Sequence, residues 1–221
     1  MPPFARLALP FACLALSFCV LAGPVRAERW TFSAGAGLGT AYRISAASAS
    51  GAEYDASWHV TADVARRLGE HWEVRTTAGD LHTSWRPALA SAPEIRVSER
   101  LTVDFAPIGA GLRFLGTPGG HGSVLAYGEV LPALYVSRWR VQESWTGDFG
   151  FSSGSRDERV SRLLAGVMVG AGIRWQAGTH LRPELALRYH HTADPGRIRS
   201  WGTSPRGVRQ LVLVASLGWA G

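Results

Sequence analysis

The chain has 221 residues, of which 46% are hydrophobic and 18% charged, and its mean hydropathy is +0.02. This composition excludes a bundle of membrane-spanning helices and also an intrinsically disordered chain. The formal net charge is +6. We expect no nucleic-acid binding from this charge, because the basic residues are spread along the chain rather than gathered in one patch.

The N-terminus has the features of a secretory signal. Arg6 gives a positive start, residues 7–23 are mostly apolar, and Val25-Arg26-Ala27 is a small-x-small cleavage site. We therefore expect a signal peptide over residues 1–27 and one mature domain over 28–221. An uncleaved membrane anchor is the alternative, although the apolar run is short for a span.

Both cysteines of the chain, Cys13 and Cys19, fall in the predicted signal peptide. The mature domain is then free of cysteine, which excludes a disulfide framework, a thiolate metal site and a cysteine nucleophile. The histidines show no spacing typical of metal ligands, and the glycine runs are not followed by a helix start that would cradle a phosphate. We expect neither a metal nor a cofactor.

After the signal, apolar and polar residues alternate with a period of two, which predicts β-strands. The first strand alternates apolar residues with small or polar ones. The apolar row of the fourth slips at Ala106-Pro107, where we expect a β-bulge. The fifth is apolar on both faces, and we place Glu129 inward because a lipid-facing carboxylate is costly. The last ends on an aromatic residue, Trp219. The expected strands cover residues 30–42, 54–66, 71–81, 100–115, 123–138, 162–175, 180–190 and 208–219.

The connections between these strands alternate in length. Short ones lie near residues 67–70, 116–122 and 176–179, and long ones near 45–53, 82–98, 140–159 and 191–207. This plan predicts an all-β fold, an eight-stranded antiparallel up-and-down transmembrane β-barrel with both termini in the periplasm.

Aromatic residues at the strand ends fit the two interfaces of a membrane. A soluble barrel of the lipocalin kind is the alternative. We expect one aromatic belt on the turn side and one on the loop side, formed respectively by Trp30, Trp72, Phe114, Trp175 and Trp219, and by Tyr42, Tyr54, Trp85, Trp139 and Tyr189.

Four segments, LTVDFAPIGAGLRFLG, YGEVLPALY, GVMVGAGIRW and LRPELALRYHH, resemble the OmpA/OmpX-type and OmpW-like families of small bacterial outer-membrane barrels. The resemblance implies an outer-membrane protein that contacts membrane lipid and lipopolysaccharide and is inserted by the barrel assembly machinery. These families tend to finish on the terminal aromatic, whereas Ala220 and Gly221 follow Trp219 here.

The inward rows carry opposite charges, which predicts an ionic network that fills the barrel. A structural or surface-interaction role follows, and a narrow pore for small solutes is the alternative. The residues expected to carry this network are Arg75, Glu129, Arg174, Glu184 and Arg188, with Asp63, Glu73, Arg113 and Arg182 on the same rows.

A second alternative is a hydrolase. The segment RYHHTADPG resembles the His-x-Ser active-site phrase of lipid A deacylases, and this resemblance implies His190 as the base and Thr192 as the nucleophile. Threonine replaces serine, strand parity points both residues inward, and no acidic residue follows Asp194.

A third feature is the arginine content of two long loops and their strand ends. Arginine binds phosphate with two parallel hydrogen bonds, so these side chains are candidates for lipopolysaccharide phosphates, with solvated loop charge as the alternative. The main candidates are Arg197, Arg199 and Arg206, and the wider set adds Arg138, Arg140, Arg156, Arg159, Arg162 and Arg209.

Overall fold

The computed structural model describes residues 30–41, 53–54, 57–86, 95–116, 124–147, 153–177, 179–196 and 207–221. The predicted signal peptide lies outside these residues and stays a prediction. Within the described ranges, no helix is long and apolar enough to cross a membrane.

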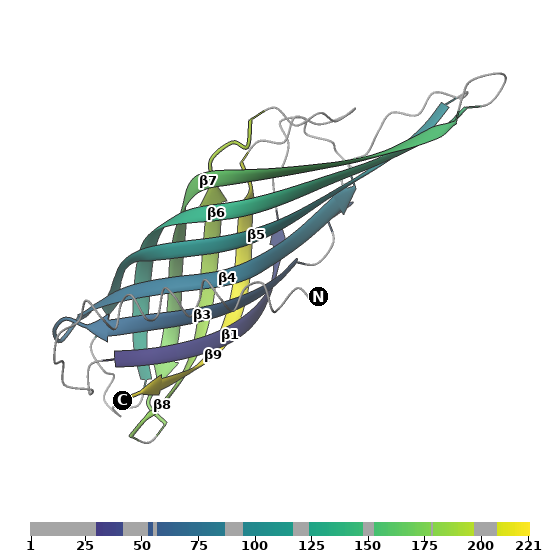
Figure 1. Ribbon diagram of the computed structural model, residues 1–221. Helices are drawn as coiled ribbons and strands as arrows, with labels where there is room; N and C mark the ends of the chain where they lie inside the picture. Colours follow the sequence, from purple (N-terminus) through teal and green to yellow (C-terminus); the bar gives the residue numbers. More distant parts are fainter. Residues whose placement is uncertain are drawn as a thin grey trace.

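The described residues form a closed β-barrel (Figure 1). Apart from the short β2, each strand pairs antiparallel with the next along the chain, and the last pairs with the first, which closes the cylinder. The two-residue β2 continues the line of β3 and likewise pairs with β4. Counted together with β3 it makes one of eight strands around the lumen, as predicted. The strands are β1 (Trp30–Ala41), β2 (Glu53–Tyr54), β3 (Ser57–Arg67), β4 (Trp72–Arg86), β5 (Ile95–Leu115), β6 (Val124–Gly147), β7 (Gly154–Trp175), β8 (Leu181–Thr192) and β9 (Arg209–Ala220).

The register of the strands fixes the width of the barrel. Following paired residues once around, from Gly172 on β7 through every neighbouring strand, leads back to β7 at Arg162, a shift of 172 minus 162, or ten residues. Strand number and shift together set strand tilt and diameter, and eight strands leave a lumen that side chains can fill.

Side chains alternate strictly between the two faces of the wall. The outward row of β9 includes Leu213, Leu217 and Trp219, which are 51%, 57% and 54% exposed, while the inward Val212 and Val214 are buried. The other strands follow the same rule, and Glu129 faces inward as predicted. The outside is therefore apolar in the region where the inside holds most of the charges.

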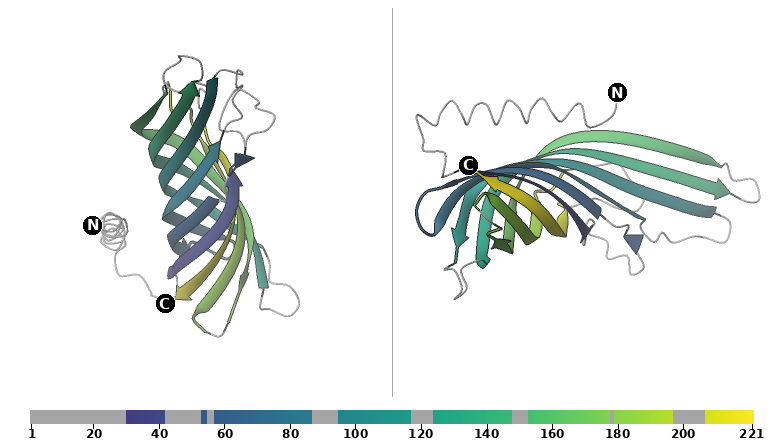
Figure 2. Two further views of the ribbon diagram at one scale, coloured as in Figure 1. Left: turned by 90° about the vertical axis from the view of Figure 1, so that its right-hand side faces the viewer. Right: turned by 90° about the horizontal axis from the view of Figure 1, so that it is seen from below.

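Three strands continue past the barrel as an arm (Figures 1 and 2). β5, β6 and β7 have 21, 24 and 22 residues, whereas the other barrel strands have 11 to 15. Two of the predicted long loops are correspondingly shorter, because residues 82–86, 95–98, 140–147 and 154–159 are strand. Sequence reasoning ended these strands where charges entered the outward row. Beyond the apolar band of the barrel, the outward-facing side chains of these strands no longer need to be apolar.

The predicted bulge at Ala106-Pro107 is wrong. β5 pairs with β6 in one unbroken register on both sides of this site, and Phe105 and Pro107 both face inward. The apolar residues of upper β5 thus fill the lumen instead of continuing the outward row. On the other side, the ladder to β4 omits the positions opposite Ala106 and Pro107, which suits a residue that has no N–H to donate.

The loop-side aromatic belt is also wrong in part. Trp85 and Trp139 face inward and are 2% and 1% exposed, so they belong to the core and not to an interface. The Tyr42 and Tyr54 side chains lie outside the described residues. The inward tryptophans join an apolar cluster that fills the loop-side half of the lumen, with Leu81, Leu101, Val103, Phe105, Tyr135, Val141, Leu164, Val208, Val212 and Val214 among its members.

The two residues after Trp219 extend the closing ladder. Ala220 pairs with Thr31 of β1, and its N–H donates to the His180 carbonyl oxygen at 2.8 Å. The Gly221 N–H donates to the Trp30 carbonyl oxygen at 3.2 Å. The terminal residues therefore help to join both neighbours of β9.

Closure between β1 and β9 can be tested by cross-linking, since the predicted mature chain has no cysteine. Ala36 and Ala215 are paired across this seam, so an A36C/A215C double variant should form a disulfide with mild oxidant, seen as a mobility change reversed by reductant. In an A36C/L211C control the two cysteines lie on the same two strands but four positions out of register, so they should stay reduced. Equal cross-linking of both pairs would contradict the register.

Candidate functional site

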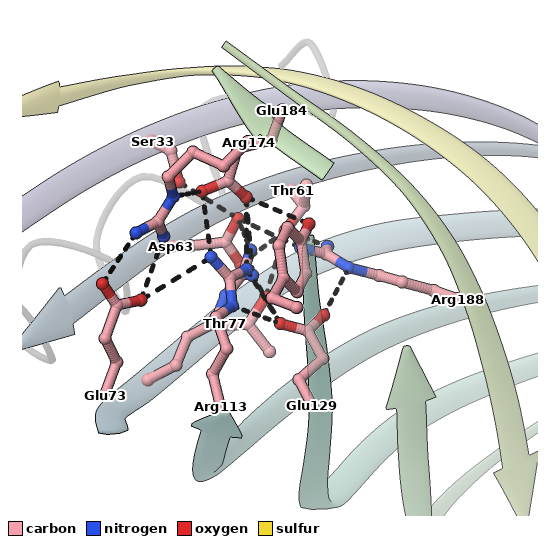
Figure 3. A network of polar contacts seen from close by, with 12 residues as sticks. Ser33, Thr61, Asp63, Glu73, Thr77, Arg113, Glu129, Arg174, Glu184 and Arg188 are labelled. Carbon is pink, nitrogen blue, oxygen red and sulfur yellow. Dashed lines mark hydrogen bonds and ion pairs between the residues drawn. The ribbon is translucent and has the colours of Figure 1, made fainter. Parts of the chain in front are cut away.

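The turn-side half of the lumen holds a neutral network of four carboxylates and four guanidinium groups (Figure 3). All eight residues are at most 4% exposed. They come from six strands, β3 to β8, so the network ties most of the wall together. Its members are Asp63, Glu73, Glu129 and Glu184 with Arg75, Arg113, Arg174 and Arg188.

Glu129 is the most connected acid. Its Oε2 accepts from Arg75 Nη1 at 2.6 Å and from Arg113 Nε and Nη2 at 3.0 and 2.8 Å. Its Oε1 accepts from Arg188 Nε at 3.1 Å. Through these contacts Glu129 fixes the positions of three long arginine side chains.

Glu184 and Glu73 form a second centre around Arg174. Arg174 donates to both oxygens of Glu73, at 2.7 and 3.0 Å, and its Nε donates to Glu184 Oε1 at 2.6 Å. Arg113 bridges the two centres, because its Nη1 also donates to Glu184 Oε1 at 2.9 Å. The two-pronged contact with Glu73 is the strongest geometry available to an arginine and a carboxylate.

Several of these contacts cross the lumen. Arg174 on β7 meets Glu73 on β4, and Arg188 on β8 reaches Asp63 on β3 at 3.5 Å. Arg75 also contacts Asp63 directly. Side chains that meet from opposite walls leave no continuous opening at this level, which is the arrangement of a plug rather than of a selectivity filter.

A glycine makes room for the network. An added Cβ at Gly170 would lie 2.9 Å from Glu129 Oε1 and 3.3 Å from Arg188 Cγ. Any larger residue at this position would displace the carboxylate that three arginines share. Gly170 is therefore part of the network although it carries no polar side chain.

The structure adds one member that sequence reasoning missed and moves another. The Tyr127 hydroxyl donates to Glu184 Oε2 at 3.2 Å, and the Arg113 Cζ lies 3.9 Å from the centre of the Tyr127 ring. The inward parity of Tyr127 was a usable signal. Arg182 lies at the turn end of the barrel instead, where its guanidinium donates to the carbonyl oxygens of Leu181 and Thr179, each at 2.9 Å.

Above the ionic layer lies a histidine layer. His190 is 1% exposed, its Nδ1 lies 3.2 Å from the Tyr135 hydroxyl, and its ring meets that of His59 edge-on at 5.1 Å. Among the described residues, His59 Nδ1, His190 Nε2 and both amide atoms of Gln210 have no hydrogen-bond partner.

The placement of His190 and Thr192 does not suit a lipid hydrolase. Both point into the barrel, while Tyr189 and His191 occupy the outward row of β8. Thr192 is 2% exposed, and its Oγ1 accepts from the Val208 N–H at 2.9 Å, a bond that joins the ends of β8 and β9. This hydroxyl is a structural acceptor inside the wall and has no route to a lipid ester.

The arginines of the arm already have acidic partners. Arg140 donates to both oxygens of Asp157, at 2.7 Å in the shortest contact, and this hydrogen bonding lowers the pKa of the exposed Asp157 carboxyl. Arg159 lies 3.6 Å from the same carboxylate, and Arg156 contacts Glu158. These pairs weaken the case for the arm as a phosphate surface. Arg197, Arg199 and Arg206 lie outside the described residues.

No group of three or more histidine, cysteine or acidic side chains in the described ranges could hold a metal ion.

The chain was compared with known proteins. No protein-family model matches the sequence, and no curated protein does. Solved structures do match. Neisserial surface protein A (NspA) is 16% identical, with 87% of this chain and 97% of that chain covered and a TM-score of 0.50. OprG from Pseudomonas aeruginosa is 13% identical, with 87% and 96% covered and a TM-score of 0.47. Ail of Yersinia pestis is 13% identical, with 86% and 99% covered and a TM-score of 0.39.

At this level of identity the likeness to NspA shows a shared fold alone. The resemblance to small outer-membrane barrels, expected from the strand segments, is confirmed at the level of the fold.

Replacing Glu129 by glutamine should destabilise the barrel strongly. The substitution leaves Arg75, Arg113 and Arg188 around a neutral amide, and removing one partner of a buried ion pair costs about 3–5 kcal/mol. Urea unfolding in detergent micelles, followed by tryptophan fluorescence, measures the change. E70Q, at an exposed turn, is the matched control and should stay within about 0.5 kcal/mol of the parent. Similar midpoints for both variants would contradict the assigned role.

Proposed function

We propose that the protein is an integral outer-membrane β-barrel with a structural or surface-interaction role and a filled interior. The observation that carries this proposal is the division of the wall into an apolar outside and a neutralised ionic inside. A soluble barrel would bury its apolar row and turn its charges to water.

The outward surface supports contact with lipid. Exposed leucine, valine and phenylalanine side chains cover the outer face over most strands, a combination that is unfavourable in water. Aromatic side chains gather at the turn end, where Trp72 and Phe114 pack edge-to-face at 5.2 Å and Arg66 lies over Trp30. Such a belt is typical of a membrane interface.

The interior supports a plug over a pore. The ionic layer spans the lumen on the turn side, and the apolar cluster with Trp85 and Trp139 fills it on the loop side. A conducting path would have to pass both layers. Two successive barriers of different chemistry favour a closed barrel as the working state.

The orientation follows from the strand plan. The short turns of outer-membrane barrels face the periplasm and the long loops face outward. This orientation would put both termini in the periplasm and the arm of β5, β6 and β7 outside the cell. The arm and the long loops would then be the parts that meet external partners, with lipopolysaccharide as the nearest partner and the barrel assembly machinery as a partner during insertion.

The closed interior predicts electrical silence. Purified, refolded protein added to planar lipid bilayers should produce no discrete current steps at any applied voltage. A general porin inserted by the same protocol is the positive control, and a folded-state mobility shift on gels without boiling shows that the silent protein is folded. Reproducible unitary steps from the folded protein would favour the narrow pore instead.

The loop arginines predict lipopolysaccharide retention. Changing Arg197 and Arg199 together to alanine should lower the amount of lipopolysaccharide that co-purifies, because two phosphate donors are lost. R140A is the matched control, since Arg140 is already paired with Asp157, and it should retain the parental amount. Unchanged co-purification of the loop variant would refute the phosphate role.

A further inference from the structure

One arginine of the outer wall has surroundings unlike those of the arginines inside the barrel. Arg66 ends the outward row of β3 and pairs with Trp30 of β1 on one side and with Val74 of β4 on the other. Its side chain is partly exposed, on the face that we assign to lipid and at the turn end of the wall. Arg66 therefore lies outside the ionic network and belongs to the membrane-facing surface.

The guanidinium group of Arg66 has no acceptor within the described ranges. The side chain makes no hydrogen bond and no ion pair there, and its Nε is buried against the wall without a partner. Its ring contact is with Trp30: the Arg66 Cζ lies 5.5 Å from the centre of that ring, within the range of a cation–π interaction. The four arginines of the ionic network, by contrast, each meet at least one carboxylate.

An unpaired guanidinium in this place calls for an anion from outside the chain. Of the three side-chain nitrogens of Arg66 only Nε is buried, so the fork of the two terminal nitrogens is open to the surroundings. Such a fork matches two oxygens of a phosphate group. A charge on the outer wall is costly in the middle of a bilayer and tolerated near its interfaces, where headgroups and water surround it.

The neighbours of Arg66 place it at the depth of lipid headgroups. Leu68 follows it on the outward side, and Trp72 begins β4 after the same turn; these side chains are 53% and 48% exposed. Trp72 packs edge-to-face on Phe114 of β5. Tryptophan gathers where hydrocarbon meets headgroups, so the phosphate of a lipid beside the wall lies at the height of the Arg66 fork. This phosphate is always next to the wall, whereas free phosphate must come from dilute solution.

Toward the middle of the membrane the same part of the wall carries small side chains. Ala62 lies four residues from Arg66 in the outward row, roughly 13 Å along the strand. It pairs with Ala34 of β1 and with Ala78 of β4, so three alanines stand side by side across neighbouring strands (Figure 1). Side chains of this size let an acyl chain lie close to the backbone of the wall.

We propose that Arg66, stacked on Trp30, binds the phosphate group of a glycerophospholipid in the leaflet that the turns face. The fork of Arg66 holds two phosphate oxygens, Trp30 positions the guanidinium, and an acyl chain lies along the alanines of β1, β3 and β4. The inference rests on the membrane location proposed above and adds one defined lipid contact to it. This site and the loop arginines lie at opposite ends of the barrel, so they would contact lipids of opposite leaflets.

The test measures lipid binding by the full folded protein in detergent micelles. Native mass spectrometry during a titration with phosphatidylglycerol separates the protein without lipid from the protein with one bound lipid. R66Q should weaken this first binding step about tenfold, because a charge-assisted hydrogen-bond pair to phosphate is lost. R66K should weaken it less, since an ammonium group keeps the charge and loses only the two-pronged contact.

R67Q is the matched control for charge. Arg67 is the next residue of β3, and its guanidinium already donates to the carbonyl oxygens of Gly69 and Glu70, at 3.0 and 2.8 Å. R67Q removes the same charge one position away and should keep the parental affinity. Diacylglycerol with the same acyl chains has no phosphate and should bind equally to the parent and to R66Q. All variants must keep the folded-state gel mobility of the parent.

Equal phosphatidylglycerol affinities of R66Q and R67Q would overturn the site and leave Arg66 as a solvated interfacial charge. Purified lipid A supplies the phosphate groups of lipopolysaccharide in a parallel titration. Lipid A binding that depends on Arg66 and is tighter than phosphatidylglycerol binding would overturn the assignment to a phospholipid, and weaker binding supports it.

The membrane location can fail separately from the phosphate site. Flotation of the parent protein with phospholipid vesicles in a density gradient tests the location alone. A parent that floats, together with equal lipid affinities of R66Q and R67Q, contradicts only the phosphate site. A folded parent that stays at the bottom of the gradient contradicts the location, and the leaflet assigned to this lipid falls with it.

Discussion

The fold depends on a requirement for charge neutrality in a lumen too narrow for bulk water. Four arginines and four acids lie in one layer, and each guanidinium meets at least one carboxylate. An ion left unpaired in such a site is far more costly than the same ion in water. The wall must therefore keep its strands in the one register that brings these charges together, and strand number, shift and parity all serve this requirement.

The ionic layer specifies the structure more than it stabilises it. Well-packed apolar residues of similar volume are often as stabilising as a buried ion pair, and the loop-side half of this lumen is filled in that way. What the charges add is a large energetic penalty for a wrong strand register. A slip of β7 by one residue would turn Arg174 to the outside and leave Glu73 and Glu184 without their shared partner. An apolar layer has no comparable penalty for a register slip, since a leucine side chain that turns outward is still acceptable to lipid.

The strands and the side of the wall that each side chain faces could be predicted from the sequence alone, because the alternation of apolar and polar residues is a local pattern. The inward position of Glu129 followed from the cost of a carboxylate in lipid, and it held. Alternation failed as a guide where the outward row stopped being apolar: the arm was taken for loops, Trp85 for an interface residue, and upper β5 for a phase slip. In each place the inward row continued without interruption, and reading that row instead would have found the extra strand length.

The partners within the network were beyond sequence reasoning for a different reason. Whether Arg174 meets Glu73 across the lumen depends on the ten-residue shift, which accumulates around the whole cylinder and leaves no local trace. The His82 and Asp104 pair is the same case on the outer wall, because 22 residues separate two side chains that the ladder places opposite each other. A filled interior leaves little room for a ligand there.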